Sequence, residues 1–268
     1  MKNLFLFAAI FSVFTLTAQN NWYNDYNTAK TECKNAGKLM VIDFWADWCK
    51  PCKIMDEKLW NNADVQINYG NFVGVRINVD EDRETPEKFT VTGIPKIVIA
   101  LPDGEILWEK TGFYDEQEFV EVLNSIPANV SELYQTYFSV LKLTKDSKCA
   151  FDIANQFQQL AGKIENKDLK YAFIQQDEAF FKKAMKDNTA PSITCHIELY
   201  LLLNDIYNGK PDKAIKKFNK TYKSVENCQN KELAHFFLAQ YYKAIDDMEN
   251  FSNEVSMITE DEFVHQLE

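Results

Sequence analysis

Two cysteines separated by two residues are the feature of this sequence that points most directly to chemistry. Cys49 and Cys52 stand in "WCKPCK", after an apolar run and at the start of a segment with helical spacing. Such a pair can form a reversible disulfide, supply half of the ligands of a zinc site, or lie in a hydrophobic core. A structural zinc site needs four ligands, and the sequence has no second Cys-X-X-Cys pair and no paired histidines. We therefore expect a redox-active pair, with no metal and no cofactor.

The compartment decides whether a disulfide persists. The chain begins with Lys2, followed by an apolar stretch from Leu4 to Leu16 that is too short to span a membrane. This pattern is typical of a secretory signal, and we expect cleavage near Ala18, although a small residue would be usual where Leu16 stands. The alternative is a buried N-terminal helix. The mature protein is predicted to be exported, periplasmic and soluble, because no later apolar run is long enough for a membrane span.

Length and charge narrow the class of protein. The chain has 268 residues, of which 46% are hydrophobic, and a formal net charge of −11. A nucleic-acid partner is not expected, because binding phosphates needs a basic surface. The length favours two domains after the signal. We predict a signal peptide over 1–18, an α/β domain over 19–126 and an all-helical domain over 127–268.

The N-terminal half alternates helix-like and strand-like segments. Helical spacing and end signals, such as Gly37 and Asp115, predict helices over 25–37, 51–60 and 115–126. Apolar runs predict strands over 39–46, 72–80 and 96–101. The segment "PDG", which is typical of a hairpin turn, predicts that a fourth strand follows over 105–112. The arrangement predicted is a parallel part of a sheet joined to a terminal hairpin, with helices covering the sheet.

Several of these segments together resemble the thioredoxin-fold family. They are "VIDFWADWCKPCK", "RINVDED", "TGIPKIVIALPDGE" and "TGFYDEQEFVEVL". The resemblance covers residues from about 22 to 126. It implies an α/β thioredoxin fold, in which helices flank a central mixed sheet, and thiol–disulfide exchange on protein substrates.

The physical roles of the two cysteines differ. The first N–H groups of a helix have no partner within the helix, and here they point toward Cys49. They favour a thiolate, so Cys49 is the predicted nucleophile. Cys52 lies one turn deeper, and we expect it to be shielded and to resolve the mixed disulfide by attacking Cys49. Lys50 replaces the glycine usual in the family and is expected to make the pair somewhat more oxidising.

The resemblance assigns further roles around the cysteines. Asp43 lies within an apolar strand, and it matches a buried carboxyl of raised pKa that moves the Cys52 proton. The alternative is an outward-facing edge residue. Pro95 resembles the family's cis-proline, packed opposite the cysteines, which leaves the Ile94 backbone free to pair with a substrate. We predict that the substrate-binding surface consists of Trp48, Lys50, Pro51, Ile94 and Pro95.

The C-terminal half carries only helical signals. Apolar residues at three- and four-residue steps predict helices over 130–143, 148–162, 168–186, 192–209, 211–225 and 231–245. Short connections favour antiparallel hairpins. One hairpin, with Leu202, Tyr207, Ala214 and Phe218 on facing helices, faintly resembles a tetratricopeptide (TPR) unit, but no second copy is evident. We expect an irregular helical bundle, with a TPR-like domain as the alternative.

Four further cysteines lie outside the pair. Cys195 is near the start of one predicted helix and Cys228 follows the end of the next, so antiparallel packing should bring these ends together. We predict a structural Cys195–Cys228 disulfide, with Cys33 and Cys149 free.

Two functions are consistent with these features. The first is an exported protein thiol–disulfide oxidoreductase, reductase-like or isomerase-like, that acts on substrate proteins with disulfides or thiols and receives electrons from a membrane donor. A disulfide-forming oxidase is the alternative within this class. The second function is a partner-binding or chaperone-like module in which the cysteine pair is an accessory.

Overall fold

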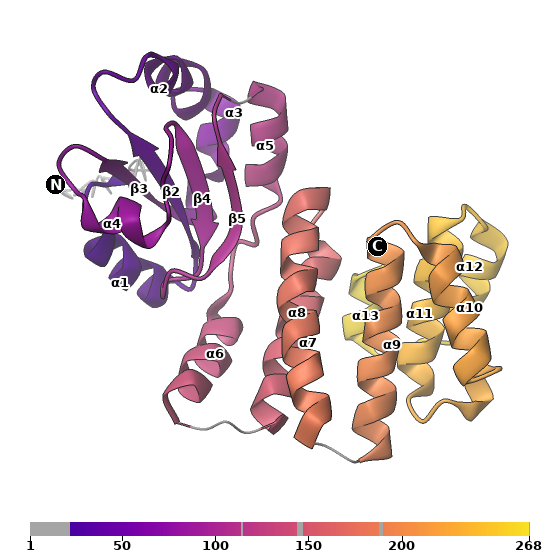
Figure 1. Cartoon of the computed structure of the whole chain (residues 1–268). Coiled ribbons are helices and arrows are strands. Elements are labelled where there is room, and N and C mark those ends of the chain that lie inside the picture. The colour runs from indigo at the N-terminus through magenta and orange to yellow at the C-terminus, as the bar shows by residue number, and fades with distance from the viewer. Residues whose placement is uncertain (1–21, 114, 144–146, 188–189, 268) are drawn as a thin grey trace, which may run out of the picture.

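A mixed β-sheet forms the centre of the N-terminal half. The structure is a computed structural model that describes residues 22–113, 115–143, 147–187 and 190–267, so the predicted signal peptide lies outside the described residues. Within these ranges the sheet has the strand order β1-β3-β2-β4-β5 (Figure 1). The strands are β1 (Trp22–Tyr23), β2 (Leu39–Trp45), β3 (Phe72–Asn78), β4 (Lys96–Ala100) and β5 (Ile106–Thr111). Strand β3 is parallel to β1 and β2, whereas β4 is antiparallel to both β2 and β5. This confirms the predicted mixed sheet with a terminal hairpin.

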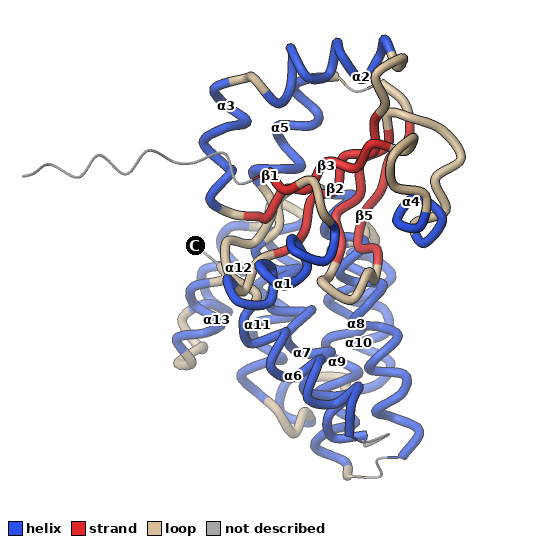
Figure 2. The backbone as a smooth tube through the Cα atoms, turned by 90° about the vertical axis from the view of Figure 1, so that its left-hand side faces the viewer, coloured by secondary structure: helices blue, strands red, loops and turns tan. Residues whose placement is uncertain are grey.

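Helices cover both faces of the sheet (Figure 2). They are α1 (Tyr26–Ala36), α2 (Lys50–Met55), a π-helix (Asp56–Trp60), α3 (Ala63–Gln66), a 3-10 helix (Ile67–Gly70), α4 (Glu84–Lys88) and α5 (Glu116–Asn124). The predicted 51–60 helix is thus an α-helix that continues as a π-helix, and β1, α3 and α4 are additions to the prediction.

The alternation of side-chain direction along β2 determines which of its residues lie on the face that carries the cysteines. Successive side chains of a strand point to opposite faces. Met40, Ile42 and Phe44 pack with α1 residues in one core cluster, whereas Leu39 and Val41 pack with residues of α2, the π-helix and α5 in another. Asp43 is in phase with Leu39 and Val41. It therefore lies on the face that carries α2, within reach of the residues that follow the cysteines.

The C-terminal half is helical. Its helices are α6 (Ser131–Leu143), α7 (Ser147–Lys163), α8 (Lys167–Asp187), α9 (Pro191–Tyr207), α10 (Pro211–Thr221), α11 (Lys231–Ala244), α12 (Met248–Val255) and α13 (Asp261–His265). The first six match the six predicted helices, and α12 and α13 are additional. Figure 1 shows α6, α7 and α8 nearest the sheet and α9 to α13 beyond them.

Two hairpins in this half use the same turn. After α9, Gly209 has φ 71°, and the Lys210 N–H donates to the Asp205 carbonyl at 2.8 Å. After α11, Asp246 has φ 61°, and the Asp247 N–H donates to the Tyr242 carbonyl at 3.0 Å. Both turns satisfy the end of a helix through a left-handed residue. The structure therefore shows a second hairpin that the sequence did not reveal. A TPR-like domain stays the alternative to the predicted irregular bundle.

The two halves share one hydrophobic core. A single cluster joins sheet and flanking-helix residues such as Ile97 and Phe119 to Tyr137, Phe157 and Phe173 of α6, α7 and α8. The division predicted at 126/127 stays a prediction, but the helical half is packed directly onto the sheet. Polar contacts reinforce this packing.

Polar contacts between the halves come from α6, from α8 and from the residue that precedes α8. The Tyr134 hydroxyl of α6 donates to the Lys38 carbonyl, next to the start of β2. The Asn166 N–H before α8 donates to Ser125 Oγ at 2.9 Å, and Gln176 Nε2 of α8 donates to Glu105 Oε1 at 3.1 Å. The orientation of the helical half relative to the sheet is thus set by both apolar and polar contacts.

Candidate functional site

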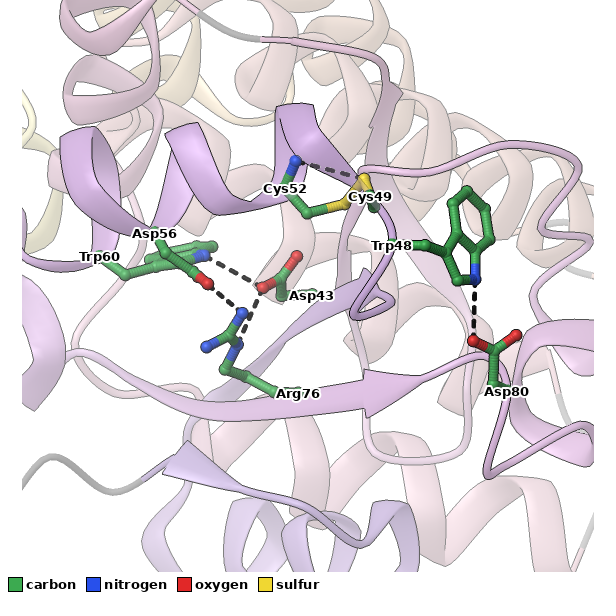
Figure 3. Close-up of a disulfide and its surroundings, with 8 residues drawn as sticks. All are labelled: Asp43, Trp48, Cys49, Cys52, Asp56, Trp60, Arg76 and Asp80. Atoms are coloured by element: carbon green, nitrogen blue, oxygen red, sulfur yellow. Dashed lines mark hydrogen bonds and ion pairs between the residues drawn. A yellow bond between two sulfur atoms is a disulfide. The ribbon is translucent and has the colours of Figure 1, made fainter.

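The two cysteines are joined at the start of α2. Cys49 and Cys52 form a disulfide with a Cα–Cα distance of 5.3 Å (Figure 3). Cys49 is the N-cap residue, and its Sγ accepts a hydrogen bond from the Cys52 N–H at 3.2 Å. Pro51 occupies the first turn, where its missing N–H leaves no gap in the helix. When the bond is reduced, the same N–H and the positive end of the helix can stabilise a negative charge on Cys49.

The two cysteines are almost equally shielded. We expected Cys52 to be shielded, and in the disulfide form Cys52 is 2% exposed and Cys49 3% exposed. Exposure therefore does not distinguish the two. The helix cap distinguishes the two cysteines, because only the Cys49 sulfur accepts a hydrogen bond from an N–H group at the start of α2.

Asp43 lies beneath the disulfide in a buried polar cluster (Figure 3). Its Oδ2 accepts hydrogen bonds from Trp60 Nε1 and Arg76 Nε, each at 3.1 Å. Arg76 Nη2 lies 2.6 Å from Asp56 Oδ1, which completes a network of two acids around one guanidinium. Burial raises the pKa of Asp43 to about 6, although the Arg76 charge acts in the opposite direction. The structure thus contains the buried carboxyl of raised pKa that the sequence predicted.

Asp43→Asn should change how stability depends on pH. The folded-state pKa of Asp43 lies above its ordinary value of 3.8, so the folded protein binds this proton more tightly than the unfolded chain does. The contribution of Asp43 to stability should therefore fall as pH rises from about 4 to about 6, by an amount on the order of 2–3 kcal/mol, and then level off. The variant should lack this contribution, so the difference between the two stability curves should change by that amount.

The measurement is urea unfolding of the oxidised protein between pH 4 and pH 8, because the closed disulfide removes cysteine ionisation from the comparison. Asp80→Asn is a suitable control, since Asp80 is exposed and bonds only outside the Asp43 cluster. Parallel stability curves for wild type and Asp43→Asn would show that Asp43 titrates normally.

The predicted substrate-binding residues lie around the disulfide. Trp48 is 66% exposed, and its Nε1 donates to Asp80 Oδ2 at 2.8 Å. The Ile94–Pro95 peptide bond is cis, and Ile94 packs against the two cysteines. Lys50 and Pro51 are exposed at the start of α2. The structure therefore brings all five residues to one end of the sheet, while their contact with a substrate stays a prediction.

A groove extends from this end of the molecule. It has a volume of about 500 Å³ and is lined by residues that include Trp48, Val79, Arg83, Glu87 and Ile94. Its walls combine apolar side chains with one cation and one anion. Such a groove can accommodate an extended polypeptide next to the disulfide.

Several residues of the site were not found from the sequence. Arg76 reaches Asp43 only because β2 and β3 pair in the register that sets these two residues side by side. Asp56 and Trp60 reach the same cluster through the π-helix, and the sequence carries no clear signal for one. Phe113 is 52% exposed beside Gly112, whose N–H donates to the Pro95 carbonyl at 2.8 Å. An aromatic residue in the polar surroundings "GFYDE" was the available signal for Phe113.

The predicted Cys195–Cys228 disulfide is not formed in the structure. Both residues are buried free thiols of the same core cluster, and Cys228 Sγ lies 3.8 Å from the Ser224 carbonyl oxygen. Burial, with Cys195 nearby, raises the pKa of Cys228 to about 11. Helix lengths placed the two residues in one region, but a disulfide also requires suitably directed Cβ atoms, which helix lengths do not determine. Cys33 and Cys149 are also free.

Within the described ranges, no group of three or more His, Cys, Asp or Glu side chains is arranged to hold a metal ion. No described helix combines the length and apolar character needed to cross a membrane.

Comparison with known proteins identifies relatives of the N-terminal half. The Thioredoxin family model matches residues 21–125. The thioredoxin of Listeria monocytogenes is 35% identical over 97 residues, which cover 36% of this chain and 90% of that protein. The thioredoxin of Bacillus subtilis is 34% identical over 87 residues, covering 32% and 80%. Among solved structures, a mutant thioredoxin from Halobacterium salinarum matches 40% of this chain and 88% of its own, with 24% identity and a TM-score of 0.30.

Proposed function

Because this chain belongs to the thioredoxin family, as its relatives show, we propose that it is an exported thiol–disulfide oxidoreductase that reduces or isomerises disulfides of protein substrates. The observation that supports this most strongly is the Cys49–Cys52 disulfide at the start of α2, with the Trp48 groove beside it. Export is supported by the apolar stretch after Lys2.

The reaction needs only groups of this chain and of the substrate. In the reduced protein, the Cys49 thiolate attacks one sulfur of a substrate disulfide, which forms a mixed disulfide and releases one substrate thiolate. Cys52 then loses its proton to Asp43 and attacks the Cys49 sulfur. This step breaks the mixed disulfide, releases the second substrate thiolate and closes the Cys49–Cys52 bond. The substrate disulfide has gained two electrons, and the cysteine pair has lost them.

Asp43 suits the second step because of its surroundings. A carboxylate whose pKa is near 6 is mostly ionised at neutral pH, so it can accept a proton, yet it binds that proton more tightly than an ordinary aspartate would. The hydrogen bonds from Trp60 and Arg76 hold Oδ2. Figure 3 shows the other carboxyl oxygen directed toward the disulfide.

The site contains features that favour a reducing role and one that favours an oxidising role. The buried Asp43 and Ile94 before Pro95 resemble reducing members of the family, whereas Lys50 favours oxidation. A reducing role outside the cytoplasm consumes electrons, so we propose a membrane protein that carries electrons to the pair as the donor. The alternative function is disulfide formation in substrate proteins by the oxidised pair.

Insulin reduction with dithiothreitol as donor tests the activity. The wild type should accelerate precipitation of the insulin chains, and the Cys49→Ser, Cys52→Ser double variant should not. Equilibration with glutathione then tests the direction. We expect a reduction potential near the value of about −270 mV typical of thioredoxin, whereas a value near about −120 mV would reverse the assignment to oxidase.

A further inference from the structure

The helices α6 and α7 enclose a polar groove far from the disulfide. Two adjoining cavities, of about 250 and 450 Å³, share the residues Glu132, Gln156 and Gln159. Figure 1 shows α6 and α7 below the sheet, whereas α2 with the cysteine pair lies above it. The groove is therefore distinct from the one beside Trp48.

Side-chain amides are the most frequent polar groups in the lining of this groove. Among the described residues that line it are Asn129, Gln135, Asn155, Gln156 and Gln159. None of these lining residues is aromatic, which disfavours a sugar ring as the ligand, because sugars usually stack on aromatic side chains. An amide offers both a donor and an acceptor, as a peptide bond does. The chemistry of the lining thus matches that of a polypeptide main chain.

Two amide oxygens in the groove lack partners. Gln156 Nε2 donates to Thr136 Oγ1 at 2.9 Å, which fixes the orientation of the amide. Gln156 Oε1 and Asn155 Oδ1 are shielded from solvent and accept no hydrogen bond within the described part of the chain. A shielded acceptor without a partner typically costs about 1–3 kcal/mol. A ligand would recover this cost where a shift of the surrounding side chains uncovers these oxygens to its N–H groups.

The charged residues of the groove favour a cationic ligand. Glu132 and Asp152 are two anions, and Lys163 is the only cation among the described lining residues. Phosphates and acidic ligands are disfavoured by this balance. A lysine or arginine side chain would be attracted to the two carboxylates.

We propose that the α6–α7 groove binds an extended peptide segment with a basic side chain, and that it holds substrate proteins while the cysteine pair reacts. On binding, neighbouring side chains shift to uncover the Asn155 and Gln156 oxygens, peptide N–H groups donate to them, and the basic side chain lies beside Glu132 and Asp152. The part of this inference that concerns substrates rests on the proposed function. The peptide binding itself does not depend on it.

The test uses fluorescent twelve-residue peptides without cysteine and the full-length protein. Three peptides differ only at two central positions, which are Lys-Lys, Gln-Gln or Glu-Glu, and a fourth is the Lys-Lys peptide N-methylated at alternate residues. Fluorescence anisotropy should give the affinity order Lys-Lys, Gln-Gln, Glu-Glu. The N-methylated peptide should bind at least about tenfold more weakly, because it lacks donors.

Variants then locate the binding site. Gln156→Leu and Gln159→Leu should each weaken binding of the Lys-Lys peptide about tenfold. Asn219→Leu is the matched control, because Asn219 is an exposed amide on α10 outside the groove, and it should leave binding unchanged. Circular dichroism confirms that each variant is folded, and the Gln159 variant carries the test if the Gln156 variant is not.

Equal binding of the N-methylated and unmethylated peptides, or no effect of either glutamine variant, would overturn the proposal. Binding of a xylan or starch oligosaccharide in place of the peptides would do the same. Because the peptides contain no sulfur, these outcomes leave the oxidoreductase proposal standing. Conversely, failure to reduce insulin would not affect the peptide measurement.

Discussion

Cys52→Ala is expected to turn a catalyst that releases its substrates into a protein that retains them. Cys49 of this variant can still attack a substrate disulfide, and the cap of α2 still favours its thiolate. The second step is lost, because no neighbouring thiol remains to attack Cys49. Mixed disulfides with substrate proteins should therefore accumulate.

The loss of turnover should be large. Effective molarities of well-oriented intramolecular reactions reach about 10⁵ M or more, whereas external thiols are present at millimolar concentration. Insulin reduction should thus fall by at least on the order of a thousandfold. Non-reducing gels should show Cys52→Ala in high-molecular-weight adducts that dithiothreitol dissolves.

Two comparisons make the trap specific. Cys33→Ala is the matched control, because Cys33 is a buried free thiol in α1, and it should form no adducts. The Cys49→Ser, Cys52→Ala double variant should also form none. If adducts formed equally in that double variant, another cysteine would be the nucleophile and the assignment of Cys49 would be lost.

Phe157→Ala should destabilise both halves of the molecule together. Phe157 is fully buried in α7 and belongs to the core cluster that includes Ile97 of β4. Its ring centroid lies 5.7 Å from that of Phe173 and 6.1 Å from that of Phe180. Removal of a buried phenylalanine side chain typically costs about 3–5 kcal/mol.

The sequence provides a separate probe for each half. All five tryptophans lie between residues 22 and 108, so tryptophan fluorescence reports on the sheet and its helices. Far-UV circular dichroism reports mainly on the helices, most of which are C-terminal. In urea, the two signals of the wild type should change together, and Phe157→Ala should shift both midpoints downward by the same amount.

Phe237→Ala is the matched control for this shift. Phe237 is equally buried, but it belongs to a second cluster, which lies mostly on α9, α10 and α11 and contains no residue of the sheet. We expect it to lower the dichroism midpoint more than the fluorescence midpoint. If Phe157→Ala moved only the dichroism signal, the halves would be energetically independent despite their shared core.

Local sequence signals predicted much of the fold. Apolar runs located β2, β3 and β4, because a covered strand needs apolar side chains on both faces. The turn signal before β5 located that strand. The Cys49–Cys52 spacing and Asp43 identified the centre of the site. Short elements were missed: α12 has eight residues and α13 five, too few for a clear helical period.

Features that depend on pairing between distant segments could not be predicted. Arg76 faces Asp43 because of the register between β2 and β3, and the sequence of a single strand does not determine this register. The missing Cys195–Cys228 bond has a similar reason, since side-chain direction follows from packing of three helices. The equivalence of the α9–α10 and α11–α12 hairpins depends on turn conformation, and glycine in one turn is replaced by aspartate in the other.

The core that α6, α7 and α8 share with the sheet has a consequence for the life of the protein in the cell. A protease that cuts the chain near residue 127 would leave both fragments held together by buried side chains, and would not release a separate small catalyst. The redox pair and the helical half should therefore remain in a one-to-one ratio even after such a cut.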